Sequence, residues 1–152
     1  MEELSPVDQL VAAMHILHLN DTSRVAGGVE VYLQDLVAGL AGLGVESTLA
    51  HGSGDGTAFR STRLLPFLSE PVLLPRRDGA YAGMAQTLAE LKPSAVHVHN
   101  IQNINAVAAC LNAVPTFLHL HDYRYVCPAS NFYYRASGTT CQLSPGAHCL
   151  WH

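Results

Sequence analysis

The sequence predicts an α/β fold, a doubly wound parallel sheet of the Rossmann-like type, on three observations. Stretches of continuous apolar residues alternate with stretches in which apolar residues recur every three or four positions, which predicts strands alternating with helices. Strands that are apolar throughout are typical of parallel sheets covered on both faces. At 152 residues, 49% hydrophobic and only 13% charged, the chain can also bury the core of a single domain.

The first half of the chain predicts a short helix followed by a strand–helix–strand unit. Ser5 and Pro6 are typical of a helix start, so we expect a leading helix over residues 1–13. Gly44 follows the last apolar position of the second helix and is expected to end it in the left-handed conformation. The expected elements are a strand over 14–19, a loop over 20–28, a helix over 29–43 and a strand over 45–50.

The second half repeats this alternation of strands and helices. Pro66 and Pro71 interrupt residues 64–74, where we expect one short strand and no helix. Beyond Asp122 the apolar pattern is lost, which predicts an irregular loop that carries cysteines. The other expected elements are a loop over 51–57, a helix over 81–91, a strand over 95–99, a helix over 104–111 and a strand over 116–121.

The expected strand order determines where a ligand would bind. With right-handed crossovers, the strand over 14–19 lies beside the strand over 95–99, where the strand order reverses. Ligands of such sheets bind beyond the carboxyl ends of the strands at this reversal. The polar residues that follow these strands are therefore candidates for a site.

Composition excludes several classes of protein. The formal net charge is −4, from 8 basic and 12 acidic residues, so a nucleic-acid partner is not expected. There is no apolar stretch long enough for a transmembrane helix. The acidic start of the chain does not resemble a signal peptide, and we expect a cytoplasmic protein in a reducing compartment. The four cysteines, Cys110, Cys127, Cys141 and Cys149, are then expected to be thiols or metal ligands before disulfides.

Three expected strands end in or near histidine, at His18, His99 and His121. Two explanations stay open: these are satisfied core histidines, or they form a zinc or iron site with neighbouring carboxylates. The polar residues that follow the three strands are Asn20, Asp21, Asn100 and Asp122. The histidines further back on the same strands are expected to be oriented structural residues: His15, His97 and His119.

Gly27 and Gly28 close the loop before the second helix. Two glycines let the backbone approach a ligand, and the helix N-terminus behind them favours an anion such as a phosphate. The dinucleotide fingerprint and the P-loop lysine are both absent, so the loop predicts a phosphate or sugar hydroxyl without identifying the nucleotide. A plain tight turn is the alternative. Glu30 at the helix start is explained by the helix dipole.

The ordered set of motifs resembles the family 4 glycosyltransferases. Residues 14–52 are similar to the opening strand, Gly-Gly loop and following helix of that family. Residues 96–100, Val-His-Val-His-Asn, resemble the end of a later strand, and residues 115–128 resemble its segment with His-Asp-Tyr and Cys-Pro. The resemblance extends over nearly all of residues 14–149, in the expected order.

This resemblance implies the first half of a GT-B fold, in which two Rossmann-like domains face each other across a cleft. It implies a retaining transfer of sugar from a nucleotide-sugar donor (UDP- or GDP-linked) to a glycan or lipid-linked acceptor, with no metal required. Gly27 and Gly28 would lie near the donor diphosphate, His121 would reach the transferred sugar, and Asp122 would orient the loop or the acceptor. The residues expected to line the acceptor side of the cleft are Asn20, Asp21, His99 and Asn100.

The resemblance also sets an expected domain organisation. Residues 14–152 would form a truncated N-terminal domain, because the chain stops before a second domain. We therefore expect a fragment or half of a split enzyme, inactive alone, whose partner is a separate or downstream C-terminal domain. Peripheral association with the inner face of a membrane is compatible with a lipid-linked acceptor. Two alternatives are a non-catalytic Rossmann-like binding domain or remnant, and a small metal-dependent hydrolase that uses the histidines.

The cysteines of the tail predict either a structural zinc site or unligated thiols. Cys127, Cys141 and Cys149 lie near His148 and His152 and could supply zinc ligands. Their spacings of thirteen and seven intervening residues differ from the close cysteine pairs of ordinary zinc ribbons. Cys110 falls in an expected helix and is predicted to be a core residue.

Overall fold

The computed structural model describes residues 5, 11, 13–72, 76–123, 126–127, 132–134, 137–142, 146 and 149. The chain divides into two compact units, Met1–His119 and Leu120–His152. The expected leading helix lies almost entirely outside the described residues. Within the part that is described, no helix is both long enough and apolar enough to cross a lipid bilayer.

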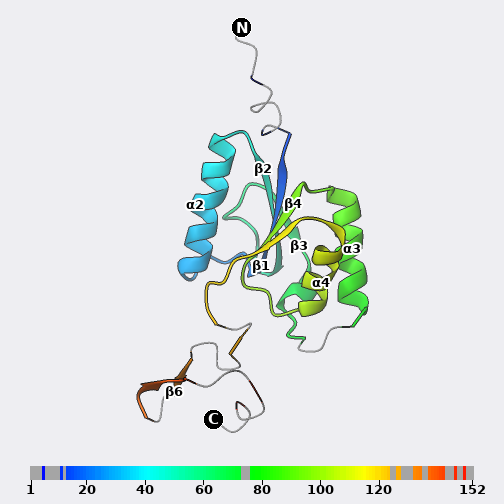
Figure 1. Cartoon of the computed structure of the whole chain (residues 1–152). Coiled ribbons are helices and arrows are strands. Elements are labelled where there is room, and N and C mark those ends of the chain that lie inside the picture. Colours follow the sequence, from blue (N-terminus) through cyan, green and yellow to red (C-terminus); the bar gives the residue numbers. More distant parts are fainter. Residues whose placement is uncertain are drawn as a thin grey trace. The chain divides into compact units, whose positions relative to one another are not determined.

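The first unit is built on a parallel sheet of five strands among the residues described (Figure 1). The strand order is β3-β2-β1-β4-β5, and the order reverses between β1 and β4, as the sequence predicts. The strands are β1 (His15–Thr22), β2 (Glu46–Ser53), β3 (Thr62–Leu64), β4 (Ala95–Val98) and β5 (Thr116–Leu118).

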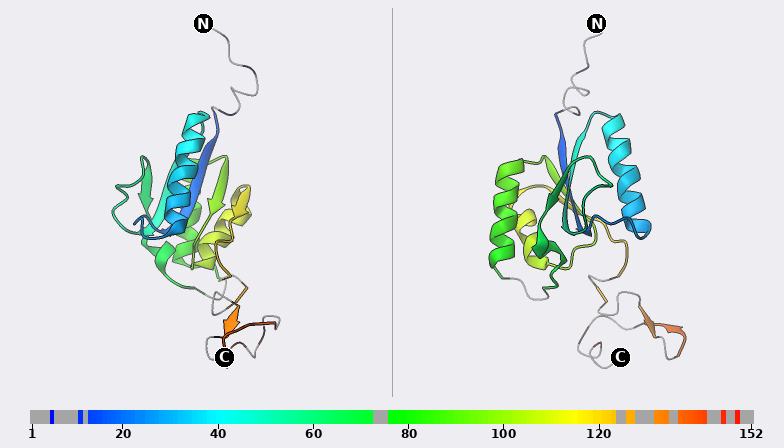
Figure 2. Two further views of the ribbon diagram at one scale, coloured as in Figure 1. Left: turned by 90° about the vertical axis from the view of Figure 1, so that its left-hand side faces the viewer. Right: turned by 180° about the vertical axis from the view of Figure 1, so that it is seen from behind.

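Helices cover both faces of this sheet, so the doubly wound α/β fold is confirmed. Helix α2 (Gly28–Gly42) lies on one face, and α3 (Gly79–Leu91) and α4 (Ile104–Ala113) lie together on the other (Figures 1 and 2). Gly44 has φ +81°, which confirms the left-handed residue expected after α2.

The two faces of the sheet differ in chemistry. Leu17 and Leu19 of β1 belong to the apolar core that Met84 of α3 and Ala106 of α4 complete. Because successive side chains of a strand point to opposite faces, His18 lies on the other face, beneath α2. His18 is paired in register with His97 of β4, so both histidines lie on that face.

Several elements differ from the sequence expectations at their ends. Strands β1 and β2 continue to Thr22 and Ser53, because polar residues there still form the ladder that pairs these two positions. His18 therefore lies in mid-strand, and its expected place at a strand end is wrong. Strand β5 ends at Leu118, three residues before His121.

The segment with two prolines also differs from the expectation of a strand without a helix. A 3-10 helix, η1, runs over Pro66–Ser69 directly after β3. Pro66 occupies its first turn, where the fixed φ of proline suits a helix start and its missing N–H costs nothing.

The second unit contains a small antiparallel hairpin where the sequence predicts only an irregular loop. Its strands are β6 (Tyr133–Tyr134) and β7 (Thr139–Thr140). Gly138, with φ +69°, lies in the turn between them. The rings of Tyr123 and Phe132 meet edge to face in the same unit, with centroids 4.9 Å apart.

Candidate functional site at the carboxyl edge of the sheet

Asn20 joins the elements that meet at the carboxyl edge of the sheet. Its side chain is fully buried. Oδ1 accepts a hydrogen bond of 3.1 Å from the backbone N–H of Asn100, just beyond β4. Nδ2 donates to the carbonyl of Thr22 at 2.8 Å and to Oε1 of Glu30 in α2 at 3.3 Å. One amide therefore fixes the end of β1 against both β4 and α2.

The Gly27-Gly28 loop leaves the N-terminus of α2 open. Gly27 is the N-cap residue, in extended conformation, and has no side chain with which to cap the helix. A Cβ added to Gly28 would meet no atom within 4 Å, whereas one added to Gly27 would lie 3.3 Å from Oε2 of Glu30. The exposed helix N-terminus with its positive dipole end can receive an anion at this place.

Asp21 ties the backbone of three elements together beside this loop. Its N–H donates to the carbonyl of Asn100 at 2.8 Å. Its own carbonyl accepts from the hydroxyls of Ser53 at 3.1 Å and Ser69 at 2.6 Å. The Asp21 backbone thus supports the edge, while its partly exposed side chain remains a candidate contact for a ligand.

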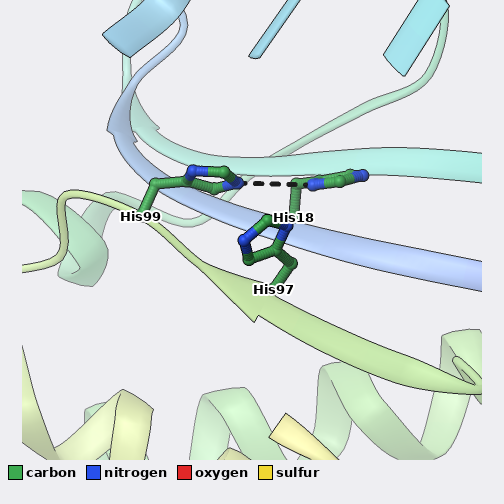
Figure 3. A group of neighbouring side chains, drawn as sticks. All are labelled: His18, His97 and His99. Atoms are coloured by element: carbon green, nitrogen blue, oxygen red, sulfur yellow. Dashed lines mark hydrogen bonds between the residues drawn. The ribbon is translucent and has the colours of Figure 1, made fainter. Parts of the chain in front are cut away.

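A cluster of imidazoles lies on the same face of the sheet, beneath α2. Figure 3 shows His18, His97 and His99, with Nδ1 of His18 3.4 Å from Nε2 of His99. His18 and His99 are fully buried, and His97 is partly buried. Burial, with smaller contributions from the neighbouring His97 and His15, lowers the pKa of His18 to about 4. Tyr32 of α2 packs edge to face on His119, with centroids 4.9 Å apart.

The structure therefore gathers six of the predicted site residues at one edge: Asn20, Asp21, Gly27, Gly28, His99 and Asn100. Sequence analysis missed His97 as a member of the buried imidazole cluster. The signal was available, because residues 97 and 99 of an extended segment share a face. His121 and Asp122 belong to the second unit, and their catalytic roles stay predictions.

The tail cysteines lie in the second unit with Tyr134. None of the four cysteines, all of which are described, forms a disulfide. The Cys141 thiol donates to the Tyr134 hydroxyl at 3.1 Å. The structural zinc remains a prediction, and its expected ligands His148 and His152 lie outside the described residues.

Comparison with known protein families places most of the chain in one family. The model of a family described as a glycosyl transferase 4-like domain matches residues 27–143, more than half of the chain. No curated protein matches the chain, and no solved structure does. The matched range includes α2 and the strands that follow it.

Proposed function

The chain belongs to the glycosyl transferase 4-like family, and from this premise we propose that it forms the acceptor-side half of a retaining glycosyltransferase. The donor would be a UDP- or GDP-linked sugar and the acceptor a glycan or a lipid-linked glycan at a membrane surface. The family match over residues 27–143 carries this proposal. A second Rossmann-like domain would supply most contacts to the nucleotide.

The open start of α2 supports a role for Gly27 and Gly28 in binding the donor diphosphate. The first N–H groups of a helix have no partners within the helix, and its dipole favours negative charge there. Because the space beside Gly28 is empty out to 4 Å, its backbone is accessible to a phosphate oxygen. The loop also follows β1, at the reversal of strand order where ligands of such sheets bind.

The polar residues beside this loop would contact the acceptor. Asp21 and Asn100 are partly exposed and joined through their backbones, so they form one rigid edge. In a retaining transfer the reacting sugar gains oxocarbenium character, so positioning and electrostatics dominate the rate. We assign contact with the transferred sugar to His121 and orientation of the loop or acceptor to Asp122.

Substitution of Gly28 tests this proposal without disturbing the fold. Gly28→Ala adds a methyl group where the protein has open space, so we expect an unchanged melting temperature. Binding of UDP- or GDP-sugars, measured by calorimetry, should weaken at least roughly tenfold, because the methyl group occupies the place of a phosphate oxygen. Gly39→Ala is the matched control, since it lies in the same helix and also meets no atom within 4 Å.

The outcomes of this experiment separate the proposal from its alternative. If wild-type and Gly28→Ala bind every nucleotide sugar equally, the loop is a plain turn and the donor assignment is wrong. If neither UDP- nor GDP-sugars bind to the wild-type chain at millimolar concentration, the non-catalytic binding domain is the better description. We expect binding by this chain to be weak and transfer to be absent without a second domain.

A further inference from the structure

Three histidines from two neighbouring strands converge beneath α2, and the transferase proposal does not use them as a group. The histidine cluster consists of His18 in β1, His97 in β4 and His99 directly after β4. One ring nitrogen from each residue lies within 4.8 Å of the nitrogens from the other two (Figure 3). Their ring centroids are 4.2 to 5.7 Å apart.

We propose that the histidine cluster binds a divalent transition-metal ion, and that zinc is its best match. Imidazole nitrogens suit zinc, copper and nickel, whereas magnesium and calcium require oxygen ligands. Three histidines with a fourth position open to water or an anion form a well-known zinc coordination set. His18 and His97 are paired on β1 and β4, and the backbone N–H of His99, directly after β4, donates to the carbonyl of Leu19 at 2.9 Å, so the sheet holds all three residues.

The separation between His18 and His99 also fits a shared metal ion. Nδ1 of His18 lies 3.4 Å from Nε2 of His99, which is long for a hydrogen bond between nitrogens. Two imidazole nitrogens on one tetrahedral zinc ion, each bound at about 2.0–2.1 Å, lie about 3.3 Å apart. The pair already has this spacing, and a ring nitrogen of His97 lies within 4.8 Å of a nitrogen of each of the other two residues.

The protein's own groups leave His18 incompletely satisfied. Its other nitrogen, Nε2, is buried and has no hydrogen-bond partner. Buried polar nitrogens without partners are rare and destabilising. On the cluster side, the ring has the long hydrogen bond to His99. A metal bound at Nδ1 would anchor the ring on that side.

Protonation state and access are both compatible with a metal. A metal ligand must be a neutral imidazole, and the complete burial of His18 disfavours its charged form. His97 is partly exposed, so this member of the cluster is in contact with solvent. On the α2 side, the Tyr32 ring lies 6.1 Å from the His99 ring and flanks the cluster. A bound ion would also join β1 to β4 beside Asn20 and Asn100.

Zinc titration of a variant without tail thiols tests the site. Cys127→Ser, Cys141→Ser and Cys149→Ser remove the tail thiols, so bound zinc then reports on histidines. After treatment with a chelator, this triple variant should bind one zinc ion per chain in calorimetry, and its melting temperature should rise with added zinc. Adding His97→Ala should weaken the zinc affinity at least roughly tenfold, because a ligand is lost.

His15→Ala is the matched control. His15 lies on the same strand, but its ring contacts the hydroxyl of Thr48 at 3.0 Å and it is outside the cluster. When His15→Ala is added to the triple variant, the zinc affinity should stay unchanged. X-ray absorption at the zinc edge needs no histidine substitution, so it decides the question even if His97→Ala does not fold. It should show nitrogen and oxygen ligands with several imidazoles.

Three results would overturn the proposal: no zinc bound by the triple variant, zinc affinity unchanged by His97→Ala, or an absorption spectrum without imidazole ligands. None of them depends on sugar transfer or on nucleotide-sugar binding. The metal site and the proposed function can therefore fail separately.

Discussion

Buried asparagines hold together the segments that surround the site. Asn20, Asn103 and Asn105 are all fully buried, and each both donates and accepts hydrogen bonds. Asn105, for example, accepts from the N–H of Arg76 at 2.7 Å and donates to Asp78 at 2.6 Å. Because a buried amide is stable only when its partners are present, these residues determine where the loops lie.

Asn103 gives a direct test of this role. Its Oδ1 caps α4 by accepting from the N–H groups of Asn105 and Ala106, and its Nδ2 donates to the carbonyl of Phe67 at 2.9 Å. Asn103→Ala should lower the free energy of unfolding by about 2 kcal/mol, measured by urea denaturation. Asn103→Ser keeps a capping oxygen and should lose less. An equal loss in both variants would mean that the cap contributes nothing.

Cys110 gives a prediction of pH dependence. Burial on α4 raises the pKa of its thiol from 9.0 to about 12. Between these values the unfolded chain has lost the thiol proton while the folded chain keeps it, so stability falls as pH rises. The loss should reach at most about 1.4 kcal/mol per pH unit. Urea denaturation of wild-type and Cys110→Ala from pH 8 to 11 isolates the contribution of this thiol. If the free energies of unfolding of the two proteins change in parallel with pH, the prediction is wrong.

His121 tests the proposed chemistry at the level of one side chain. In the complete transferase, His121→Ala should lower turnover roughly a hundredfold, about 3 kcal/mol of transition-state stabilisation. Its melting temperature should stay near that of wild-type. Turnover and melting are measured on the same preparation, with His15→Ala as the control histidine. A folded variant with normal turnover would remove His121 from the catalytic assignment.

Some of the site residues could be predicted from the sequence, and others could not. Asn20 and Asn100 were found because polar residues follow apolar strands, and the structure joins them by a hydrogen bond. The pairing of His18 with His97 could not be found in the same way, because it depends on the register between β1 and β4. Register is set by contacts between distant segments and is not visible in either strand alone.

At the level of elements, close packing of loops explains glycines that have no role in ligand binding. A Cβ on Gly52 would lie 2.1 Å from Oγ and 2.3 Å from the backbone nitrogen of Ser69, so β2 and η1 touch there. The existence of β1, β2, β4 and β5 was predicted from apolar runs. Strand ends were not, because Thr22 and Ser53 extend the ladder through backbone pairing, which hydropathy does not report.

Substitutions distinguish a glycine required by close packing, such as Gly52, from a glycine in open space, such as Gly39. Gly52→Ala should lower the free energy of unfolding by about 1–3 kcal/mol, because the backbone of Ser69 must move. Gly39→Ala in the middle of α2 should instead be neutral or stabilising by up to about 1 kcal/mol, since alanine favours the helix. Urea denaturation of both variants gives the comparison. A stable Gly52→Ala protein would mean that β2 and η1 can separate without cost.

At the scale of the whole molecule, strand order was the most predictable feature. Alternating strands and helices with right-handed crossovers allow few arrangements, and the observed order, with β1 beside β4, is one of them. The tail was less predictable, because short hairpins such as β6–β7 depend on turn geometry and contain too few residues for a clear pattern. The clustering of histidines on the face beneath α2 was also difficult to predict, since histidines in apolar strands resemble core residues.

The division of the chain into two units predicts that the first unit folds alone. Strands β1 to β5 and both layers of helices lie within residues 13–119, together with the apolar core. A protein of residues 13–119 should therefore unfold cooperatively, with a melting temperature within a few degrees of the whole chain, because the core that stabilises it is retained. Circular dichroism and urea denaturation on both proteins measure this. Asn103→Ala in the shorter protein provides the control, since it should cost the same free energy as in the whole chain if the core is unchanged. Loss of cooperative unfolding in the shorter protein would show instead that residues 120–152 are needed to complete the sheet domain.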